Sequence, residues 1–299
     1  MKLKPYILAN YVINRIGVLD PNVLIGPSIG EDAAAIDLGG DRILVIHVDP
    51  ISGAVEYVGW LAVHIACNDI AVTGARPKWL LSVLYLPEGV SLEIIDTITQ
   101  QIDSAAKEVN AMIVGGHTEY TPGINRPLIS MTAAGLATKT SFVRTGGAKE
   151  GDYIIMTKTA GVEGTSILAS DFSDILVDKG VPSSIIELSR NFIKRISVIK
   201  EALALSENGL VNSMHDPTEG GLIGGLTEIA YASNKTIEVW EDKVPVATET
   251  RTICSALKID PLKLISSGVL LASVSENKLK EAIKIINSIG INVAIIGRV

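Results

Sequence analysis

The chain has 299 residues, of which 26 are Lys or Arg and 33 are Asp or Glu, so its formal net charge is −7. This acidic balance, with no run of Lys or Arg, argues against a nucleic-acid-binding surface, because phosphate contacts need clustered cations. Hydrophobic residues make up 47% of the chain, enough to bury a core, and at roughly 150 residues per domain the length predicts about two domains. Cys67 and Cys254 have no metal-ligand spacing and favour a reducing compartment.

The N-terminal segment Met1–Val18 carries positive charge, but polar residues such as Asn10 and Arg15 interrupt its apolar stretch. We therefore expect an amphipathic helix there rather than a signal peptide. The longest apolar runs, such as Trp79–Leu86, fall well short of the roughly 18 residues that a membrane span needs. Together these features predict a cytoplasmic protein that does not bind a membrane.

Strands and helices alternate in the first half of the chain. Apolar residues at helical spacing predict one helix over Glu56–Thr73 and another after Ser91, a plausible N-cap. Runs rich in β-formers predict strands over Arg42–Val48, Trp79–Leu86, Ala111–Val114 and Pro127–Ala137, the second of them buried. The first of these strands should end at Asp49-Pro50, because proline has no N–H to donate.

The polar, glycine-containing segment Thr138–Glu150 is the best candidate for a domain boundary. We place the boundary after residue 142, which gives domains 1–142 and 143–299. Beyond it the pattern predicts, in chain order, a strand (Tyr153–Thr157), a helix from about Gly164, a long helix (Ser183–Leu205), a helix after Thr218, strands near Thr236–Trp240 and Gly268–Val274, a helix (Leu279–Ile289) and a strand (Val293–Ile296). Interleaved strands and helices predict an α/β or α+β class.

Common catalytic motifs are absent from the sequence. No glycine precedes a lysine, so there is no P-loop, and neither His-Glu-x-x-His nor a strand followed by G-x-G-x-x-G occurs. The segment Gly26–Gly30 matches the G-x-S-x-G pattern of a hydrolase nucleophile elbow, which needs a strand before the serine and a helix after it. Because Ser28 lies near the start of the chain and follows Pro27, we interpret this segment as a plain loop.

Three aspartates stand at positions that need an explanation. Asp32 lies at the mouth of a run of small residues, Asp49 follows a predicted strand, and Asp69 lies in an apolar helix, where an unpaired carboxylate is costly to bury. Mg²⁺ takes hard oxygen ligands and is typically held by a few carboxylates plus nucleotide phosphates. These carboxylates are therefore candidates for one magnesium site. Spacing alone leaves open that each is a cap or a solvated charge.

Glycine-rich segments supply the candidate anion contacts. Gly115–Glu119 follows a predicted strand, where backbone can approach a ligand closely. His215–Gly221 opens a helix with Thr218 as a natural N-cap, and a helix N-terminus presents N–H groups to an anion. The segment Thr159–Thr165, which contains Gly161, is a third such place. For each of these segments, the alternative to anion binding is a purely structural role as a turn and a helix cap.

In this order, the segments resemble a known superfamily: aminoimidazole ribonucleotide synthase (PurM), selenophosphate synthetase, thiamine-monophosphate kinase and the hydrogenase maturation protein HypE. The matching segments are GEDAAAID (30–37), HVDP (47–50), NDIAVTGARP (68–77), GGHTE (115–119), KEGDYIIMTKTAG (149–161), HDPTEGGL (215–222) and IIGRV (295–299). They cover essentially the whole chain, and the third and sixth are quite specific in combination.

The resemblance implies a two-domain PurM-like fold. Its N-terminal ATP-binding domain would form a dimeric β-barrel with a second subunit, and a C-terminal α/β domain would close the cleft over ATP. The resemblance places Mg²⁺ ligands at Asp32, Asp49 and Asp69, and a catalytic role at Asp216. It places nucleotide or phosphate contacts at Gly30, Glu31, Asn68, Gly115, Gly116, His117, Thr118, Gly161, Thr218, Gly220 and Gly221.

Among these families the sequence looks closest to HypE, which uses ATP to dehydrate a thiocarboxamide on its own C-terminal cysteine. Here the sequence ends in Gly297-Arg298-Val299, and neither Cys67 nor Cys254 is placed to replace a tail thiol. We therefore expect a homodimeric, Mg²⁺- and ATP-dependent enzyme that activates an oxygen of a small or protein-bound acceptor by phosphoryl transfer. Two alternatives remain: a tail-less HypE paralogue that serves as a nucleotide-binding scaffold for a maturation partner, and a kinase like thiamine-monophosphate kinase.

Overall fold

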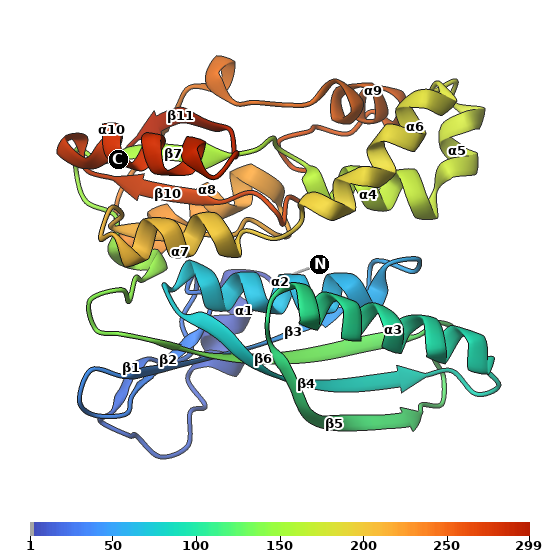
Figure 1. The fold of residues 1–299 in the computed structure, drawn as a ribbon, viewed down its shortest axis with the longest axis horizontal. Coiled ribbons are helices and arrows are strands. Elements are labelled where there is room, and N and C mark those ends of the chain that lie inside the picture. Colours follow the sequence, from blue (N-terminus) through green and yellow to red (C-terminus); the bar gives the residue numbers. More distant parts are fainter. Residues whose placement is uncertain (1–2) are drawn as a thin grey trace.

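The computed structural model describes residues 3–299, which form two β-sheets with helices packed between them (Figure 1). The sheet of the first half has six strands in the order β1-β2-β3-β6-β4-β5, and that of the second half has five in the order β8-β10-β7-β11-β9. Neighbouring strands are antiparallel except β4 and β5, which are parallel and joined by helix α3. The mixed α/β class is confirmed.

The elements of the first half are α1 (Pro5–Leu8), a π-helix (Ala9–Ile13), β1 (Val23–Ile25), β2 (Ala34–Asp37), β3 (Ile43–Ile51), α2 (Val58–Val72), β4 (Arg76–Leu86), α3 (Leu92–Glu108), β5 (Met112–Tyr120) and β6 (Leu128–Ala137). Those of the second half are a 3₁₀ turn (Thr145–Gly147), β7 (Tyr153–Thr157), α4 (Val162–Asp171), α5 (Ser173–Asp178), α6 (Ser183–Arg190), a 3₁₀ turn (Asn191–Arg195), α7 (Ile199–Glu207), β8 (Ser213–His215), α8 (Gly221–Ser233), β9 (Glu238–Val239), a 3₁₀ turn (Glu241–Lys243), α9 (Thr248–Leu257), β10 (Leu271–Val274), α10 (Glu276–Ser288) and β11 (Val293–Arg298).

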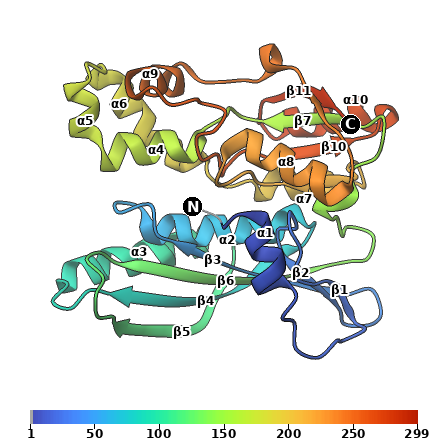
Figure 2. The same cartoon turned by 180° about the vertical axis from the view of Figure 1, so that it is seen from behind.

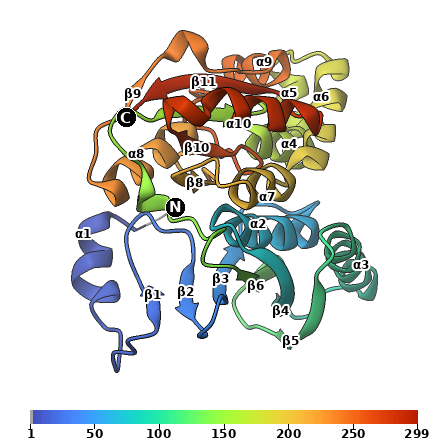
Figure 3. The ribbon, with the colours of Figure 1, turned by 60° about the vertical axis from the view of Figure 1, so that its left-hand side comes forward.

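Helix α2 is buried along nearly its whole length, because it lies between the first sheet and the second half (Figure 3). It packs against β3, β6 and α3 on one side and against α7 on the other. A helix that is apolar all round is stable only when every face is covered. Gly59 allows the close approach of α3, since a Cβ there would lie 2.4 Å from the backbone oxygen of Ile98.

No helix formed by residues 3–299 packs on the opposite face of the first sheet. The strand expected to be buried, Trp79–Leu86, instead alternates: Leu80 and Leu84 are buried under the helices, whereas Trp79 and Leu81 are 38% and 44% exposed on the outer face. Strand β5 is exposed along its whole length at one edge. Within residues 3–299 this sheet is open, with β1 and β5 at its edges, so one chain does not close a barrel.

Strand β3 continues past the point where we expected it to end. Asp49, Pro50 and Ile51 stay in register with β6, Pro50 opposite Ser130. On its other side β3 pairs with β2 only as far as Ile46. Beyond that residue one edge of β3 is free, and proline is tolerated on a free edge because no partner needs its missing N–H.

The second sheet packs with α7, α8 and α10, and a separate group of helices, α4, α5, α6 and α9, extends from one end of it (Figures 1 and 2). This helical group has its own small core, which includes Leu176, Ile186 and Ile253. A short connection leads from the end of β7 at Thr157 to Gly161, which is the N-cap of α4 and has a φ of +76°. Helix α4 therefore connects the helical group directly to the second sheet.

The prediction of a single long helix over Ser183–Leu205 is wrong. A 3₁₀ turn follows α6, and α7 starts only at Ile199. The cause is Asn68 on α2: its Oδ1 accepts the N–H of Val198 at 2.9 Å, and its Nδ2 donates to the carbonyl of Ile196 at 2.9 Å. These bonds hold the backbone between the two helices in a conformation that a continuous helix would not allow.

The N-terminal helix is shorter than expected. Residues 5–13 are helical, none of them is buried, and Met1 and Lys2 lie outside the described residues. Its apolar residues Ile7, Leu8 and Ile13 are only half-buried, so packing gives this short helix little stabilisation. Across residues 3–299, no helix combines the length and the apolarity needed to cross a bilayer.

The segment joining the halves runs close to the end of α2. The N–H of Val143 donates to the carbonyl of Thr73, and a Cβ on Gly74 would lie 1.8 Å from the oxygen of Ser141. The following turn, Thr145–Gly147, packs against α8 and β8. The boundary after residue 142 stays a prediction.

Candidate functional site

A cluster of two carboxylates and a histidine lies where β3 faces α2. His47 and Asp49 are two residues apart on β3, so their side chains leave the same face of the strand. That face looks toward α2, since their partners on β6, Ala133 and Met131, are buried. Asp69 lies on the facing side of α2, and the three residues offer ligand atoms that all lie within 4.8 Å of one another.

The donor set of this cluster fits a divalent cation. Asp49 and Asp69 supply hard carboxylate oxygens of the kind that Mg²⁺ takes, one or two from protein and the rest from phosphate and water. His47 Nε2 lies 3.0 Å from Asp69 Oδ2 and so holds that carboxylate in place, as hydrogen bonds to metal-binding carboxylates commonly do. We did not single out His47 from the sequence, although its spacing of two from Asp49 in a predicted strand is a usable signal.

Asp32 does not join this cluster. Its Oδ1 lies 2.6 Å from Nδ1 of His215, and its Oδ2 accepts a hydrogen bond from Thr145. The other ring nitrogen of His215 lies 2.9 Å from Oε2 of Glu228. Burial alone would lower the pKa of His215, but the two carboxylates outweigh it and raise the pKa to about 10. The imidazole is thus held as a buried cation between two acids, and Asp32 as a metal ligand stays a prediction.

The residues before Asp32 dock the first half onto the second. Glu31 Oε1 pairs with Arg144, and its Oε2 accepts the N–H of Thr145 at 3.1 Å. Gly30 has a φ of +88°, and a Cβ there would lie 2.8 Å from the backbone oxygen of Glu228. Both residues are therefore engaged by the protein itself, and their expected nucleotide contacts stay predictions.

Asn68 and Asp216 form a buried bridge between the halves. Asn68 Nδ2 donates to Asp216 Oδ2 at 2.7 Å, and the N–H of Gly268 donates to Asp216 Oδ1 at 3.1 Å. Burial raises the pKa of Asp216 to about 8, although the Asn68 amide and His215 act to lower it. With 1% exposure and both oxygens bonded, Asp216 sits behind the site in this structure. Its catalytic role and the nucleotide contact of Asn68 stay predictions.

The helix openings differ from our expectation. Thr218 is not the N-cap of α8: Gly220 is, with a φ of +87°, and the N–H of Gly221 bonds back to the carbonyl of Thr218. Gly161 does cap α4, but its N–H donates to Ser266 Oγ at 2.9 Å. The amides of Gly161 and Gly221 are therefore used within the chain, and anion binding at these segments stays a prediction.

The glycine-rich segment Gly115–Glu119 lies within strand β5 rather than after a strand. Gly115, Gly116, His117 and Thr118 pair with β4 along the exposed edge. Strands β6 and β4 separate β5 from β3, which puts these residues about 14 Å from the cluster at about 4.8 Å per strand. One chain alone does not bring them to Asp49 and Asp69.

A pocket of about 550 Å³ opens beside Asp49, between the two halves of the chain. Its walls come from the end of β3 and the loop after it, from α2 and α4, and from the segments before α8 and β10. The lining residues are Asp49, Pro50, Ile51, Ser52, Gly53, Ala54, Ile65, Glu163, Ile167, Thr218, Glu219 and Ile265. Asp49 of the candidate cation cluster thus lines a cavity large enough for a small molecule.

Glu163 is the feature of this pocket that sequence reasoning missed. It stands in the first turn of α4, is 3% exposed, and its Oε2 has no hydrogen-bond partner among the described residues. Burial raises the pKa of Glu163 to about 7, with Asp49 and Glu219 adding to the shift and Ser267 opposing it. The sequence did contain a usable signal, since Glu163 is a carboxylate at the start of a predicted helix. We applied this criterion to Asp69 but not to Glu163.

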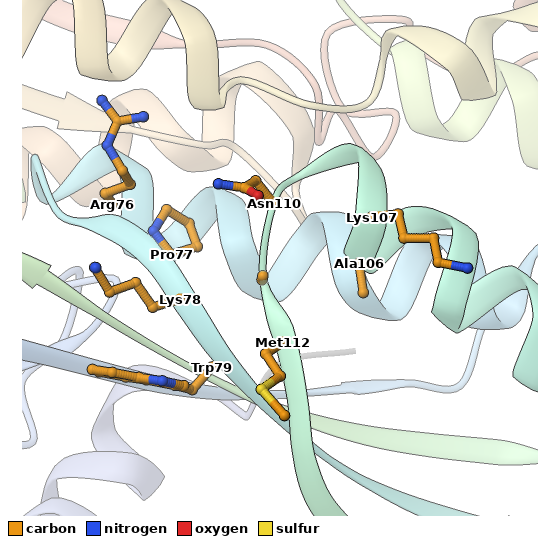
Figure 4. Close-up of a pocket in the computed structure, with 9 residues that line it drawn as sticks. Arg76, Pro77, Lys78, Trp79, Ala106, Lys107, Asn110 and Met112 are labelled. Atoms are coloured by element: carbon orange, nitrogen blue, oxygen red, sulfur yellow. The ribbon is translucent and has the colours of Figure 1, made fainter.

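A second pocket, of about 470 Å³, lies at the start of β4 and β5 (Figure 4). Arg76, Lys78 and Lys107 line it, but Lys107 extends away from the other two in Figure 4. Arg76 pairs with Glu207 at 2.6 Å, and Lys107 pairs with Asp103 at 2.5 Å. Because two of its three cations are already paired and do not converge, this pocket is not built like a phosphate site.

The fold and the site together define a class: a two-sheet α/β protein with a candidate cation site and a small-molecule pocket between its halves. The chain belongs to the AIR synthase related protein family. The N-terminal domain of that family matches residues 30–137, and its C-terminal domain matches residues 149–299. The expected membership of the PurM-related superfamily is therefore confirmed.

Individual relatives cover nearly the whole chain. A putative hydrogenase expression/formation protein of Methanocaldococcus jannaschii is 31% identical, over 99% of this chain and 87% of its own length. A selenide, water dikinase of Caldanaerobacter subterraneus is 26% identical, over 100% of this chain and 92% of its own. The crystal structure of hydrogenase maturation protein HypE in complex with ATP superposes with a TM-score of 0.73 at 25% identity, covering 98% of this chain and 85% of that one.

Proposed function

We propose that this chain is a Mg²⁺- and ATP-dependent enzyme that activates an oxygen of a small substrate by phosphoryl transfer. The observation that carries the proposal is the convergence of Asp49 and Asp69, from two different elements, in one cluster beside the pocket that Asp49 lines. Catalysis of phosphoryl transfer is mostly positioning and neutralisation of charge. A magnesium ion supplies that neutralisation when it is bound.

The relatives support the same activity. The selenide, water dikinase is named as a kinase, and the similar HypE structure holds ATP. Both align over nearly all of this chain, including its two halves. The use of ATP by an enzyme of this family is therefore the function best supported for this chain. The requirement for Mg²⁺ is a further part of the proposal and depends on the Asp49–Asp69 cluster.

Each residue of the site has a distinct task in this proposal. Asp49 and Asp69 bind the cation, and His47 orients Asp69 from 3.0 Å. The Asn68–Asp216 bridge and the Asp32–His215–Glu228 group hold the two halves at a constant separation, so that the pocket keeps its shape. The acceptor occupies the pocket, next to Asp49.

The test is the affinity for Mg-ATP and the release of ADP in Asp49→Asn and Asp69→Asn. We expect affinity to fall at least about 10-fold in each, since even the loss of a residue that only orients a ligand costs 10–100-fold. Asp242→Asn, an exposed aspartate 3.3 Å from Lys243, is the matched control and should bind like the parent. Unchanged Mg-ATP affinity in both site variants would overturn the assignment.

We further propose that the enzyme works as a homodimer through the outer face of the first sheet. Val48, Trp79 and Leu81 are exposed there, and Met112 and Val114 are exposed on the adjoining strand β5. Monomers rarely leave a contiguous apolar patch of this kind uncovered. A second chain on this face would also cover the free edge of β5.

A second candidate role is a place in hydrogenase maturation beside a partner protein. The relative from Methanocaldococcus jannaschii, named as a putative hydrogenase expression/formation protein, favours it. In that setting the chain would be either an enzyme or a nucleotide-binding scaffold. Measurement of ADP release over a panel of acceptors separates the two, because a scaffold binds nucleotide without turnover.

A further inference from the structure

A pocket of about 490 Å³ lies between the two halves and shares no lining residue with the pocket beside Asp49. The first half lines it with the start of β4 and the end of α3. The second half lines it with the turn before α7, the start of α7 and the connection between α10 and β11. Its charged lining residues are five cations, Arg76, Lys158, Lys194, Arg195 and Lys200, and two carboxylates, Glu108 and Glu201. A chain of net charge −7 therefore gathers an excess of positive charge around one pocket.

Two of the five cations are already paired within the protein. Lys158 lies 2.6 Å from Glu201 and donates to two backbone carbonyls, so this buried pair is complete. Arg76 extends toward the second half (Figure 4) and pairs with Glu207 at 2.6 Å. The remaining carboxylate, Glu108, is 52% exposed, and its ion-pair partner is a histidine, at 3.8 Å, rather than one of these cations.

The other three cations have no such partner. Among residues 3–299, no carboxylate forms an ion pair with Lys194, Arg195 or Lys200, and none of these side chains donates a hydrogen bond to the protein. Arg195 is half-buried, with its guanidinium 4.8 Å from the centre of the Phe192 ring. Burial lowers the pKa of Arg195, and Glu249 opposes the shift. Its planar group of N–H donors thus lacks an acceptor from the described chain, and this donor arrangement matches the oxygens of a phosphate.

We propose that this pocket binds a small molecule through a phosphate group, either inorganic phosphate or a phosphate monoester. Arg195 donates to two of its oxygens, and Lys194 and Lys200 add positive charge at the rim. A phosphate carries nearly two negative charges at neutral pH and so matches three unpaired cations better than a carboxylate does. The volume suits a small molecule. This site is separate from the proposed function, since it contains no residue of the Asp49–Asp69 cluster.

The test is phosphate binding by the full chain in EDTA, so that the Asp49–Asp69 cluster holds no cation. Inorganic phosphate and methyl phosphate are titrated and followed by ³¹P NMR, and acetate is added as a competitor. We expect both phosphates to bind in the millimolar range or tighter, and acetate to compete at least about 10-fold more weakly because it carries a single charge. Tighter binding of methyl phosphate would assign the site to a monoester, and the reverse order to the free anion. Absence of saturable binding of both would overturn the proposal.

Arg195→Gln removes the guanidinium and keeps a polar side chain. We expect phosphate affinity to fall at least about 10-fold, as the loss of a charge-assisted hydrogen bond usually causes. The matched control is Arg42→Gln, since Arg42 is exposed and makes no ion pair within residues 3–299. Arg42→Gln should bind phosphate like the parent. Equal phosphate affinity in the two variants would contradict the role of Arg195.

Lys194→Gln combined with Lys200→Gln tests the rim with two exposed side chains, whose replacement leaves the core intact. We expect phosphate affinity to fall about fivefold, the combined effect of two exposed charge contacts. Lys179→Gln combined with Lys280→Gln removes two exposed charges elsewhere in the second half and should bind phosphate like the parent. An equal loss in the two double variants would show a general effect of net charge and refute the pocket assignment.

Mg-ATP affinity in the same variants separates this site from the proposed active site. We expect Arg195→Gln and the Lys194–Lys200 variant to bind Mg-ATP within about twofold of the parent, because their effects should be confined to a different pocket. A parallel loss of phosphate and Mg-ATP affinity would place the phosphate in the active site and overturn the proposal. A parent that binds phosphate in EDTA but no Mg-ATP refutes the proposed function alone.

Discussion

Buried charges in this protein occur in groups that link elements far apart in the chain. His215 lies between Asp32 and Glu228, and Lys158 lies 2.6 Å from Glu201 while donating to the carbonyls of Ser197 and Gly268. Charges removed from water persist only when they are paired and hydrogen-bonded. The Asp32–His215 pair therefore holds the two halves together, whereas the Lys158–Glu201 pair joins the segment after β7 to α7 within the second half.

His215 should make stability depend on pH. Its folded pKa of about 10 lies above the ordinary value of 6.5, so its contribution is full below about pH 6.5 and is lost as pH rises through about 10. His215→Gln should remove this part of the slope and lower the free energy of unfolding near pH 6 by about 3–5 kcal/mol, as loss of one partner of a buried pair usually does. Urea unfolding at a series of pH values measures both effects.

The matched control for this prediction is His117→Gln, on the exposed strand β5. It should leave both the slope between pH 6.5 and 10 and the stability near pH 6 unchanged. If His215→Gln retains the slope of the parent, His215 does not carry the proton that its position between two carboxylates implies.

Among the elements, helix α2 decides how the two halves fit. It carries Asp69 toward β3 and Asn68 toward the second half, from adjacent positions in the chain. Neighbouring residues on a helix point about 100° apart. One helix can therefore supply a site residue on one side and a bridging residue on the other, provided that both sides are covered.

Asn68→Ala should destabilise the protein strongly. It would leave the N–H of Val198, the carbonyl of Ile196 and one oxygen of Asp216 without their bonds in a buried place. At about 1–3 kcal/mol for each unsatisfied group, we expect a loss of about 3 kcal/mol or more in the free energy of unfolding. Asn208→Ala, which loses one exposed bond to Ala204, should change it by no more than about 0.5 kcal/mol. Equal losses in the two variants would refute the bridging role of Asn68.

The predicted positions of helices and strands were accurate where the spacing of neighbouring residues was sufficient to define the element. Ser91 caps α3 as expected, with its Oγ accepting the N–H of Ile94, and the central strands and helices lie within a few residues of their predicted ends. The break between α6 and α7 could not be found in this way, because its cause, Asn68, lies 130 residues before Val198. The prediction that the strand ends at Asp49-Pro50 failed for a related reason. Whether proline ends a strand depends on whether a second strand pairs with it on that edge, and β2 pairs with β3 only as far as Ile46.

At the scale of the whole molecule, the exposed outer face of the first sheet should mediate dimerisation. Trp79→Glu combined with Leu81→Glu places two charges on this face, and desolvating them would oppose association. We expect the parent to have twice the chain mass of 31.7 kDa by light scattering, and the double variant to have the mass of one chain. This prediction tests the dimer separately from catalysis.

The control for the dimer prediction is Ile175→Glu combined with Val177→Glu on α5. These side chains are 47% and 55% exposed, comparable with Trp79 and Leu81, but they belong to the helical group of the second half. The control should keep the mass of the parent. A parent that elutes as a single chain, or an outer-face variant that stays dimeric, would contradict an interface on this face.

The sequence by itself determined the class of fold, the family and the identity of Asp49 and Asp69 as residues in need of an explanation. Strand and helix periodicity is local, and the order of short motifs along the chain is enough to place it in the AIR synthase related protein family. Only the tertiary structure decided that His47 stands beside Asp69, that Asp32 pairs with His215, and that Glu163 is buried at the wall of the pocket. The physical reason is that partners and burial depend on which strands and helices become neighbours in space, and residues more than a hundred positions apart meet only once both sheets are built.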